Sequence, residues 1–261
     1  MGAIVSALAF PVPDKNLSKD VLLARQSQLV KLMTKSGLYI PAISIKGSPT
    51  ARYTIIYSHG NAEDVGLSVY YLDRLAAMCD CNVFAYEYPG YSISDGEPSE
   101  ENCYEAIQAA FEYVTNQLHI PPSQIVLFGR SLGSGPTVDM ASQPEATNLA
   151  GVILQSPLES GIRAVIGQCS SYGLYPLDIF RNYSKVHLIT CPVFIMHGTA
   201  DRVVPCDNGR ALYATLQQRD CHIDYPPRWI NGRGHNNMPE RECLYECRQF
   251  LSFLAKQQTS I

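Results

Sequence analysis

The feature that most constrains how this chain can fold is the turn encoded by residues 129–133, Gly-Arg-Ser-Leu-Gly. It directly follows the apolar run 125–128 and precedes a stretch of helical character through 137–141. A turn this tight brings the positions two before and two after the serine against neighbouring backbone, which favours glycine at both. The pattern predicts a buried strand, a sharp turn that presents Ser131, and a helix.

From about residue 40 onward, short β-rich runs alternate with stretches of helical period. This alternation is typical of an α/β fold with a mostly parallel sheet and helices on both faces. We expect strands at 42–46, 53–58, 82–86, 124–128, 149–155, 192–196 and 223–229. Apolar residues spaced by three and four predict helices over 104–118 and 244–254. We therefore divide the chain into an N-terminal anchor and helical segment, 1–40, and one sheet-containing domain, 41–261.

Composition excludes several functional classes. The 261 residues carry a net charge of −4, and the basic residues are scattered, which argues against nucleic-acid binding. No run approaches the roughly 18 apolar residues of a membrane-spanning helix. The nine cysteines show neither a disulfide framework nor the paired CxxC arms of a zinc site, and reduced thiols fit a cytosolic protein. We expect no metal, no cofactor and a monomer.

A serine hydroxyl becomes a useful nucleophile only when a base takes its proton and a third group orients that base. The candidate base is His235, in the glycine-rich loop 231–237. The candidate acid is Asp201, which follows the apolar run 193–196, and its rival is Glu159, one predicted strand earlier. The chain order Ser131, Asp201, His235 favours Asp201.

The charge that develops on a substrate oxygen during such a reaction needs fixed hydrogen-bond donors. One candidate is the backbone amide of Leu132, directly after the serine. The second should come from the loop that follows strand 53–58, where Asn61 is the first candidate and Ala62 the next. The alternative is that this loop simply turns at its glycine.

The segment 157–191 must hold both the return connection to the sheet and any lid over the site. Its 35 residues leave room only for a minimal cap, so we expect an open groove. The candidates for an apolar groove lining are Ile162, Val165, Ile166, Leu174, Tyr175, Leu177, Ile179 and Phe180. We expect about half of them to face the sheet instead.

Several motifs outside the turn extend this interpretation: 57–62 (Tyr-Ser-His-Gly-Asn-Ala), 88–100, 155–163 and 197–201 (His-Gly-Thr-Ala-Asp). Together with the serine turn and 234–236 (Gly-His-Asn), they resemble the alpha/beta hydrolase domain-containing protein 17 family from about residue 50 to the carboxyl end. The resemblance implies an alpha/beta-hydrolase fold and a membrane-attached serine hydrolase. Such an enzyme removes fatty acyl chains from cysteine thiols of proteins, with Ser131, Asp201 and His235 as its triad.

The same machinery leaves other functions open. A lipid or small-ester hydrolase is the first alternative, followed by a serine peptidase and by a catalytically silent binding module. The expected partner is accordingly an S-acylated protein or a lipid ester, with peripheral membrane contact. A thiolate leaves readily, because the reference pKa of a cysteine thiol is only about 8.5.

The amino terminus bears on attachment to a membrane. Residues 1–6, Met-Gly-Ala-Ile-Val-Ser, fit the pattern in which Gly2 is myristoylated. The alternatives are an ordinary apolar segment or a signal peptide cleaved after 7–9, but no positive charge precedes the apolar run and Pro11 ends it early. The related family attaches through N-terminal cysteines, whereas this chain has none before Cys79. We expect a cytoplasmic protein held peripherally on a membrane by Gly2, aided by a local charge of +3 over residues 1–35.

Overall fold

The computed structural model describes residues 10, 12–14, 16–166, 177–219 and 225–258. They form one eight-stranded sheet in the order β1-β2-β4-β3-β5-β6-β7-β8. The strands are β1 (Leu29–Met33), β2 (Tyr39–Ile45), β3 (Thr54–Ser58), β4 (Asn82–Tyr86), β5 (Ile125–Arg130), β6 (Gly151–Gln155), β7 (Val193–Gly198) and β8 (Arg228–Ile230). β2 runs antiparallel to β1 and β4, and the other neighbouring strands are parallel.

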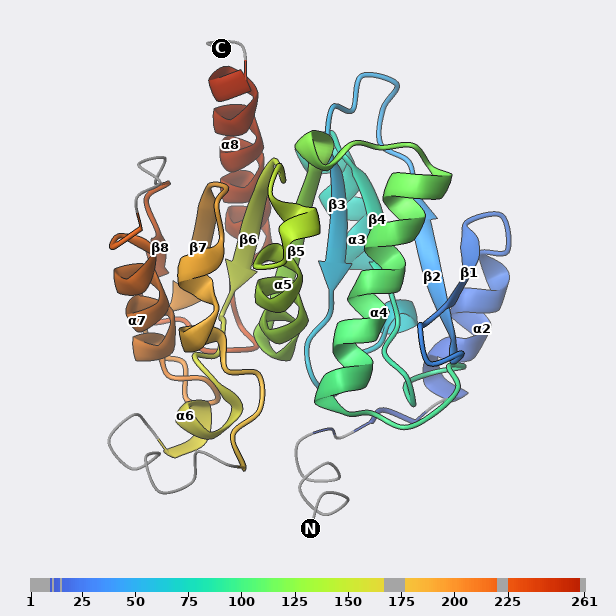
Figure 1. Cartoon of the computed structure of the whole chain (residues 1–261), viewed down its shortest axis with the longest axis horizontal. Coiled ribbons are helices and arrows are strands. Elements are labelled where there is room, and N and C mark those ends of the chain that lie inside the picture. The colour runs from blue at the N-terminus through green and yellow to red at the C-terminus, as the bar shows by residue number, and fades with distance from the viewer. Residues whose placement is uncertain (1–9, 11, 15, 167–176, 220–224, 259–261) are drawn as a thin grey trace.

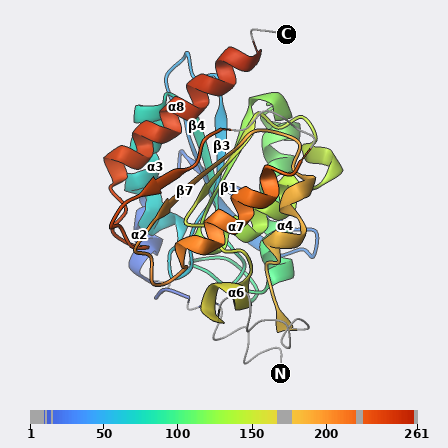
Figure 2. The same cartoon turned by 90° about the vertical axis from the view of Figure 1, so that its left-hand side faces the viewer.

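Helices cover both faces of the sheet, as the alternating pattern predicts. One layer consists of α2 (Asn16–Ala24), α3 (Val65–Cys79) and α8 (Glu240–Gln258), and the other of α4 (Glu100–Glu112), α5 (Ser134–Ala141) and α7 (Cys206–Leu216). Figure 2 shows the sheet between these two layers. Successive residues of a strand point to opposite faces, so Ile55 and Tyr57 of β3 pack in one apolar cluster while Ile56 packs in the other.

The predicted elements from residue 41 onward are present, with small shifts at their ends. The predicted helix over 104–118 is α4 followed by a π-helical turn, Tyr113–Gln117. The apolar stripe of α8 is buried as expected, including Leu244 and Leu251. The last strand is shorter than predicted, and residues 223 and 224 lie outside the described residues.

β1 is the strand that the sequence did not predict. It pairs along its whole length with β2, so the sheet begins at Leu29, before residue 41, and the segment 1–40 contains a strand as well as α2. β1 is a five-residue edge strand with Lys31 exposed at its centre. Short edge strands that carry lysine lack the continuous apolar run that marks a buried strand, which is why this one has a weak signal.

The topology places the candidate site at the carboxyl ends of the central strands. After β3 the chain passes through α3 to β4 on one side of β3, whereas after β5 it passes through α5 to β6 on the other side. Loops that leave in opposite directions open a crevice at the carboxyl ends of parallel strands, where α/β proteins bind ligands. The pairing of Ser58 with Gly129 sets the loop after β3 beside the serine turn. The short helix α6 (Gly161–Ile166) lies beyond these strand ends (Figure 1).

Two further expectations concern membranes and cysteines. In the described parts of the chain, no helix is long and apolar enough to cross a membrane. Seven of the nine cysteines lie in those parts as buried thiols, and Cys169 and Cys221 lie outside them.

Candidate active site

The serine turn has the strained geometry that its glycines predict. Ser131 directly follows β5 and adopts a left-handed backbone conformation with φ of 52°. A Cβ atom on Gly129 would lie 2.6 Å from the Gly133 carbonyl oxygen, and one on Gly133 would collide with the Ser58 carbonyl oxygen. Glycine is therefore required at both positions so that the turn can pack between β3 and α5. The result is a serine fixed at the carboxyl end of the central strands.

The structure brings the three predicted catalytic residues together. His235 Nε2 lies 2.7 Å from Ser131 Oγ, and His235 Nδ1 lies 2.7 Å from Asp201 Oδ2. A carboxylate only accepts hydrogen bonds, so Nδ1 carries the proton and Nε2 accepts from the serine hydroxyl. All three residues are less than 10% exposed. This is the geometry in which an imidazole can take the serine proton while a carboxylate holds the ring in one tautomer.

Asp201 is held by more than His235. Its Oδ1 accepts hydrogen bonds from the Val203 and Val204 amides, each 2.9 Å long. His197 Nε2 lies 2.9 Å from the Val204 carbonyl oxygen, which only accepts, so this nitrogen carries a proton that also points at Asp201 Oδ2, 3.3 Å away. His197 was not among the residues predicted to act at the site, although its position at the end of β7, four residues before Asp201, was an available signal.

The protonation of Asp201 follows from this environment. Burial raises its pKa, but hydrogen bonds from His197 and His235, together with electrostatic attraction to His235, outweigh burial and bring the pKa well below the usual range. The folded pKa is depressed, so the ionised form stabilises the fold above the unfolded pKa of roughly 3.9, and this contribution is lost as the pH falls through the folded pKa. Asp201 is therefore ionised at neutral pH, as an orienting acid requires.

The rival carboxylate, Glu159, has a different task. It is 4% exposed and forms an ion pair with Arg163 on α6. The Arg163 guanidinium in turn lies 3.6 Å from the centre of the Tyr183 ring. These contacts tie the cap helix to the end of β6, while the carboxylate hydrogen-bonded to His235 is that of Asp201.

The loop after β3, which carries the candidate oxyanion donor, is anchored by a buried pair. His59 Nε2 lies 2.7 Å from Glu87 Oε1, and neither side chain is exposed. Glu87 Oε2 also accepts a hydrogen bond from the Val65 amide at the start of α3. The Tyr91 hydroxyl donates to Asn61 Oδ1 over 2.9 Å. The loop is thus fixed at both of its ends and through its central side chain.

The two candidate donors lie on the same groove as the serine. Asn61 and Leu132 line a cavity together with Ser131. The alternative donor, the Ala62 amide, lies 3.2 Å from Asn61 Oδ1 and is used within the loop. Asn61 and Leu132 therefore remain the candidates for holding a negative oxygen next to Ser131.

This cavity is an apolar groove of about 390 Å³ between the serine turn and α6. Five of the residues predicted to line it do so: Ile162, Val165, Leu177, Ile179 and Phe180. Leu158, Val203 and Val204 add to its apolar wall. Leu174 and Tyr175 lie outside the described residues, and Ile166 lies at the end of α6. The volume is within the range of small-molecule sites, about 300–1,000 Å³.

Among the residues that the structure describes, no three or more His, Cys, Asp or Glu side chains are grouped so as to hold a metal ion. His235 is already hydrogen-bonded to both Asp201 and Ser131.

The sheet order, the left-handed turn after β5 and the loops that follow β3, β7 and β8 define this chain as an alpha/beta hydrolase. Residues 53–171 match the alpha/beta hydrolase fold family, and residues 171–260 match the prolyl oligopeptidase family. Closer relatives identify a narrower group. The chain belongs to the alpha/beta hydrolase domain-containing protein 17 family.

Similarity along most of the chain shows membership of that family. The chain is 36% identical over 226 residues to alpha/beta hydrolase domain-containing protein 17C of Xenopus laevis, which covers 86% of this chain and 70% of the relative. It is 38% identical over 221 residues to protein 17B of Homo sapiens, with coverage of 84% and 73%. The family predicted from the sequence motifs is confirmed.

Solved structures show the fold alone, because their sequence identities are low. An esterase from Rhodococcus sp. superposes with a TM-score of 0.65 at 17% identity, covering 87% of this chain and 99% of its own. An esterase from Pyrococcus furiosus gives a TM-score of 0.63 at 16% identity, covering 86% and 88%. The predicted alpha/beta-hydrolase fold is confirmed.

Proposed function

We propose that this protein is a serine hydrolase that removes fatty acyl chains from cysteine thiols of proteins. His235 takes the proton of Ser131 as Oγ attacks the acyl carbonyl carbon, and the amides of Leu132 and Asn61 hold the negative oxygen. His235 then gives that proton to the departing thiolate, which leaves an acyl group on Ser131. Attack by a water molecule, with His235 again as base, releases the fatty acid and restores the serine.

The observation that carries this proposal is the apolar groove that begins at Ser131. Its walls are almost entirely aliphatic and aromatic, and Val165 and Val203 at its rim are 82% and 58% exposed. A groove that is apolar along its length and open at its side fits a long acyl chain better than a small polar substrate. The hydrogen-bonded trio argues against a silent binding module.

A second candidate, a lipid or small-ester hydrolase, would use the same three catalytic residues and the same apolar groove. The catalytic machinery alone does not separate the two, since a thioester and an oxyester share the acyl group. The match of residues 171–260 to the prolyl oligopeptidase family suggests a peptidase as a third candidate. Cleavage of an amide is chemically more demanding than cleavage of a thioester. The leaving nitrogen must be protonated as it departs, whereas a thiolate with a reference pKa of about 8.5 leaves with little help.

The test compares three palmitoyl substrates that differ only in the bond to be cleaved. A palmitoylated cysteine peptide, the matched serine oxyester and the matched amide are offered in the same detergent micelles. We expect the thioester to have the highest kcat/KM and the amide to show no measurable turnover. A higher kcat/KM for the oxyester would favour the lipid-ester alternative, and cleavage of the amide would favour the peptidase.

We further propose that the protein is cytoplasmic and is held peripherally on a membrane by a myristoyl group on Gly2, a residue outside the described part of the chain. The nearby described residue Phe10 is 4% exposed and packs edge-on against Phe180, with 6.0 Å between ring centres. Phe180 also lines the apolar groove. Attachment at the amino terminus would therefore keep the groove close to the bilayer. Arg25, one of the basic residues counted above, is engaged in an ion pair with Asp73, which weakens the electrostatic supplement.

We expect Gly2→Ala to move the protein from the membrane pellet to the supernatant. A single myristoyl chain binds with only about 10⁴ M⁻¹, so the wild type should divide between pellet and supernatant, and high salt should lower its pelleted share. The measurement is fractionation of both proteins with a C-terminal tag at low and high salt. Turnover of a water-soluble ester serves as the control and should be equal. Equal pelleted shares would contradict acylation of Gly2 as the anchor.

A further inference from the structure

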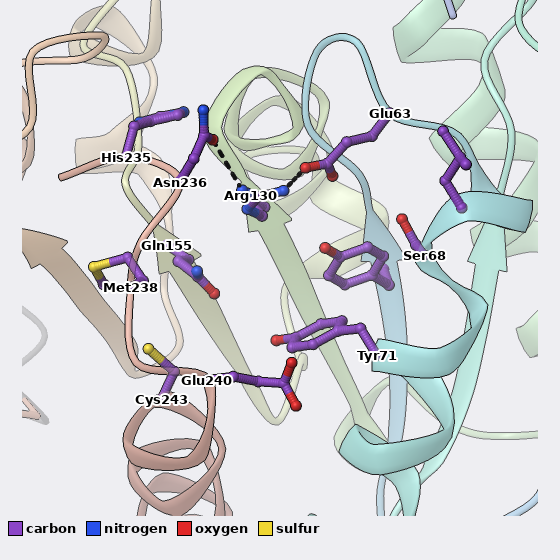
Figure 3. A pocket seen from close by; sticks show the side chains of 12 residues that line it. Glu63, Ser68, Tyr71, Arg130, Gln155, His235, Asn236, Met238, Glu240 and Cys243 are labelled. Carbon is purple, nitrogen blue, oxygen red and sulfur yellow. Dashed lines mark hydrogen bonds and ion pairs between the residues drawn. The ribbon is translucent and has the colours of Figure 1, made fainter. Parts of the chain in front are cut away.

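A second cavity, of about 270 Å³, lies beside His235 on the face of the sheet that α3 and α8 cover (Figure 3). Its walls come from the end of β3 and the loop after it, from α3, from the ends of β5 and β6, from the loop between β8 and α8, and from the start of α8. Ser131 and Leu132 line the apolar groove instead. The hydrogen bond between His235 and Ser131 therefore lies between the two cavities. Unlike the groove, this cavity is rich in polar groups.

Two polar atoms in its wall lack a hydrogen-bond partner among the described residues. Gln155 is 7% exposed and its Oε1 atom is unpaired, as is the hydroxyl of Tyr71. Figure 3 shows both side chains pointing into the cavity. Buried polar groups are nearly always hydrogen-bonded, and leaving one unpaired is costly. An occupant that donates to Gln155 and accepts from Tyr71 would satisfy both.

The charges of the cavity are already matched within the protein. Arg130 forms an ion pair with Glu63, and Glu240 pairs with Arg74, with 2.7 Å between Oε2 and Nη2. An anionic headgroup or a carboxylate would therefore find no surplus positive charge here. Burial raises the pKa of the Cys243 thiol in the wall to about 12, so this cysteine is neutral and is not a candidate acyl acceptor. The cavity favours a neutral occupant that both donates and accepts hydrogen bonds.

The order of events at the triad assigns a role to each cavity. The acyl chain extends from the carbonyl carbon into the apolar groove that Ser131 and Leu132 line. The leaving group must lie next to His235, because that residue returns the proton to it. The polar cavity, which His235 lines, is therefore on the side of the leaving group.

We infer that this cavity binds the leaving-group side of the substrate, and that a peptide bond next to the acylated cysteine occupies it. A peptide bond supplies one N–H for Gln155 Oε1 and one carbonyl oxygen for the Tyr71 hydroxyl. Burial raises the pKa of Tyr71 well above its ordinary value, so its hydroxyl remains a donor. The inference rests on the proposed function, since it identifies the acyl carrier as a polypeptide rather than a lipid.

The test measures selectivity for the carrier. The substrates are a palmitoylated peptide with residues on both sides of the acylated cysteine, S-palmitoyl ethanethiol, which has no amide, and a palmitoyl monoglyceride. The variants Gln155→Leu and Tyr71→Phe remove the two polar groups and nearly preserve side-chain volume. We expect each to lower the ratio of kcat/KM for the peptide to that for the ethanethiol thioester by about 3- to 10-fold, the worth of one neutral hydrogen bond.

The matched control is Tyr70→Phe, the same change at the neighbouring position of α3, where the side chain is 65% exposed. It should leave the ratio unchanged, and equal rates of labelling by a fluorophosphonate would show that the triad is intact in every variant. An unchanged ratio in both cavity variants would overturn the inference and leave the thioesterase proposal standing. A selective loss with the monoglyceride would overturn it in favour of a glycerol occupant. A labelled wild type that hydrolyses neither thioester would overturn the proposed function, and this inference with it.

Discussion

Replacing Ser131 by alanine should lower turnover by about a million-fold, the loss typical when a triad serine is removed. Oγ is the atom that bonds to the acyl carbon, and no other hydroxyl is hydrogen-bonded to His235 among the described residues. The variant should also fail to react with a fluorophosphonate. Alanine and serine both carry a Cβ atom, so the strain at φ of 52° is nearly equal and the melting temperature should change little.

The chain offers a matched control for this substitution. Ser156 follows β6 as Ser131 follows β5, and its φ of 48° is also left-handed. Its backbone differs little from that of Ser131, but its hydroxyl has no hydrogen-bond partner in the described structure. The Ser156→Ala variant should therefore keep the turnover of the wild type. A Ser131→Ala protein that retains more than a few per cent of wild-type activity would show that another group is the nucleophile.

Replacing Asp201 by asparagine should lower turnover by about 10⁴-fold. The amide is neutral and can donate where the carboxylate only accepted, so His235 loses the partner that keeps its proton on Nδ1. Nε2 then no longer faces Ser131 as an acceptor. The measurement is kcat on a water-soluble ester, together with a melting curve, because Asp201 also binds the Val203 and Val204 amides.

Glu159→Gln is the paired variant that separates the two carboxylates. It removes the charge that pairs with Arg163 and loosens α6, but it leaves the hydrogen bond between Asp201 and His235 in place. We expect a much smaller change in kcat than for Asp201→Asn, and an effect mainly on KM for long acyl chains, because α6 walls the groove. The opposite order of effects would mean that the acid has been assigned to the wrong strand.

The positions of the two cavities would allow one substrate to place its apolar part in one cavity and its polar part in the other. His235 and Ser131 stand between a groove lined by aliphatic side chains and a cavity lined by Gln155, Tyr71 and an ion pair. An acylated cysteine has the same division, with an alkyl chain on one side of the thioester and a peptide on the other. The predicted preference for a peptide thioester follows from this match.

Much of the fold and of the site could be predicted from local patterns in the sequence. The serine turn was evident because steric exclusion at Gly129 and Gly133 acts between residues that are close in the chain or sit in the adjoining strand. The buried strands and the stripes of α4 and α8 were evident because burial imposes a fixed period on apolar residues. Ser131, Asp201 and His235 each follow such an element. Their positions at strand ends could therefore be predicted together with the strands.

The choice between Asp201 and Glu159 depended on the order of strands. Both carboxylates are buried and both follow a parallel strand. His235 follows β8, which pairs with β7, so Asp201 after β7 lies one strand nearer than Glu159 after β6. Strand spacing of about 4.8 Å decides which side chain can reach the imidazole, and sequence patterns favour an order without showing it.

Tertiary structure alone decided the contacts between distant segments. The pairing of β1 with β2, the hydrogen bond from His197 toward Asp201, and the cavity between Tyr71 and Gln155 involve polar or edge positions with no periodic signature. Local steric constraints and burial act over a few residues, so they produce recognisable patterns of residue types along the sequence. Hydrogen bonds between strand ends and helices depend on how the layers pack. The sequence by itself therefore determined most of the elements and the chemistry at their ends, while packing determined which of those ends meet.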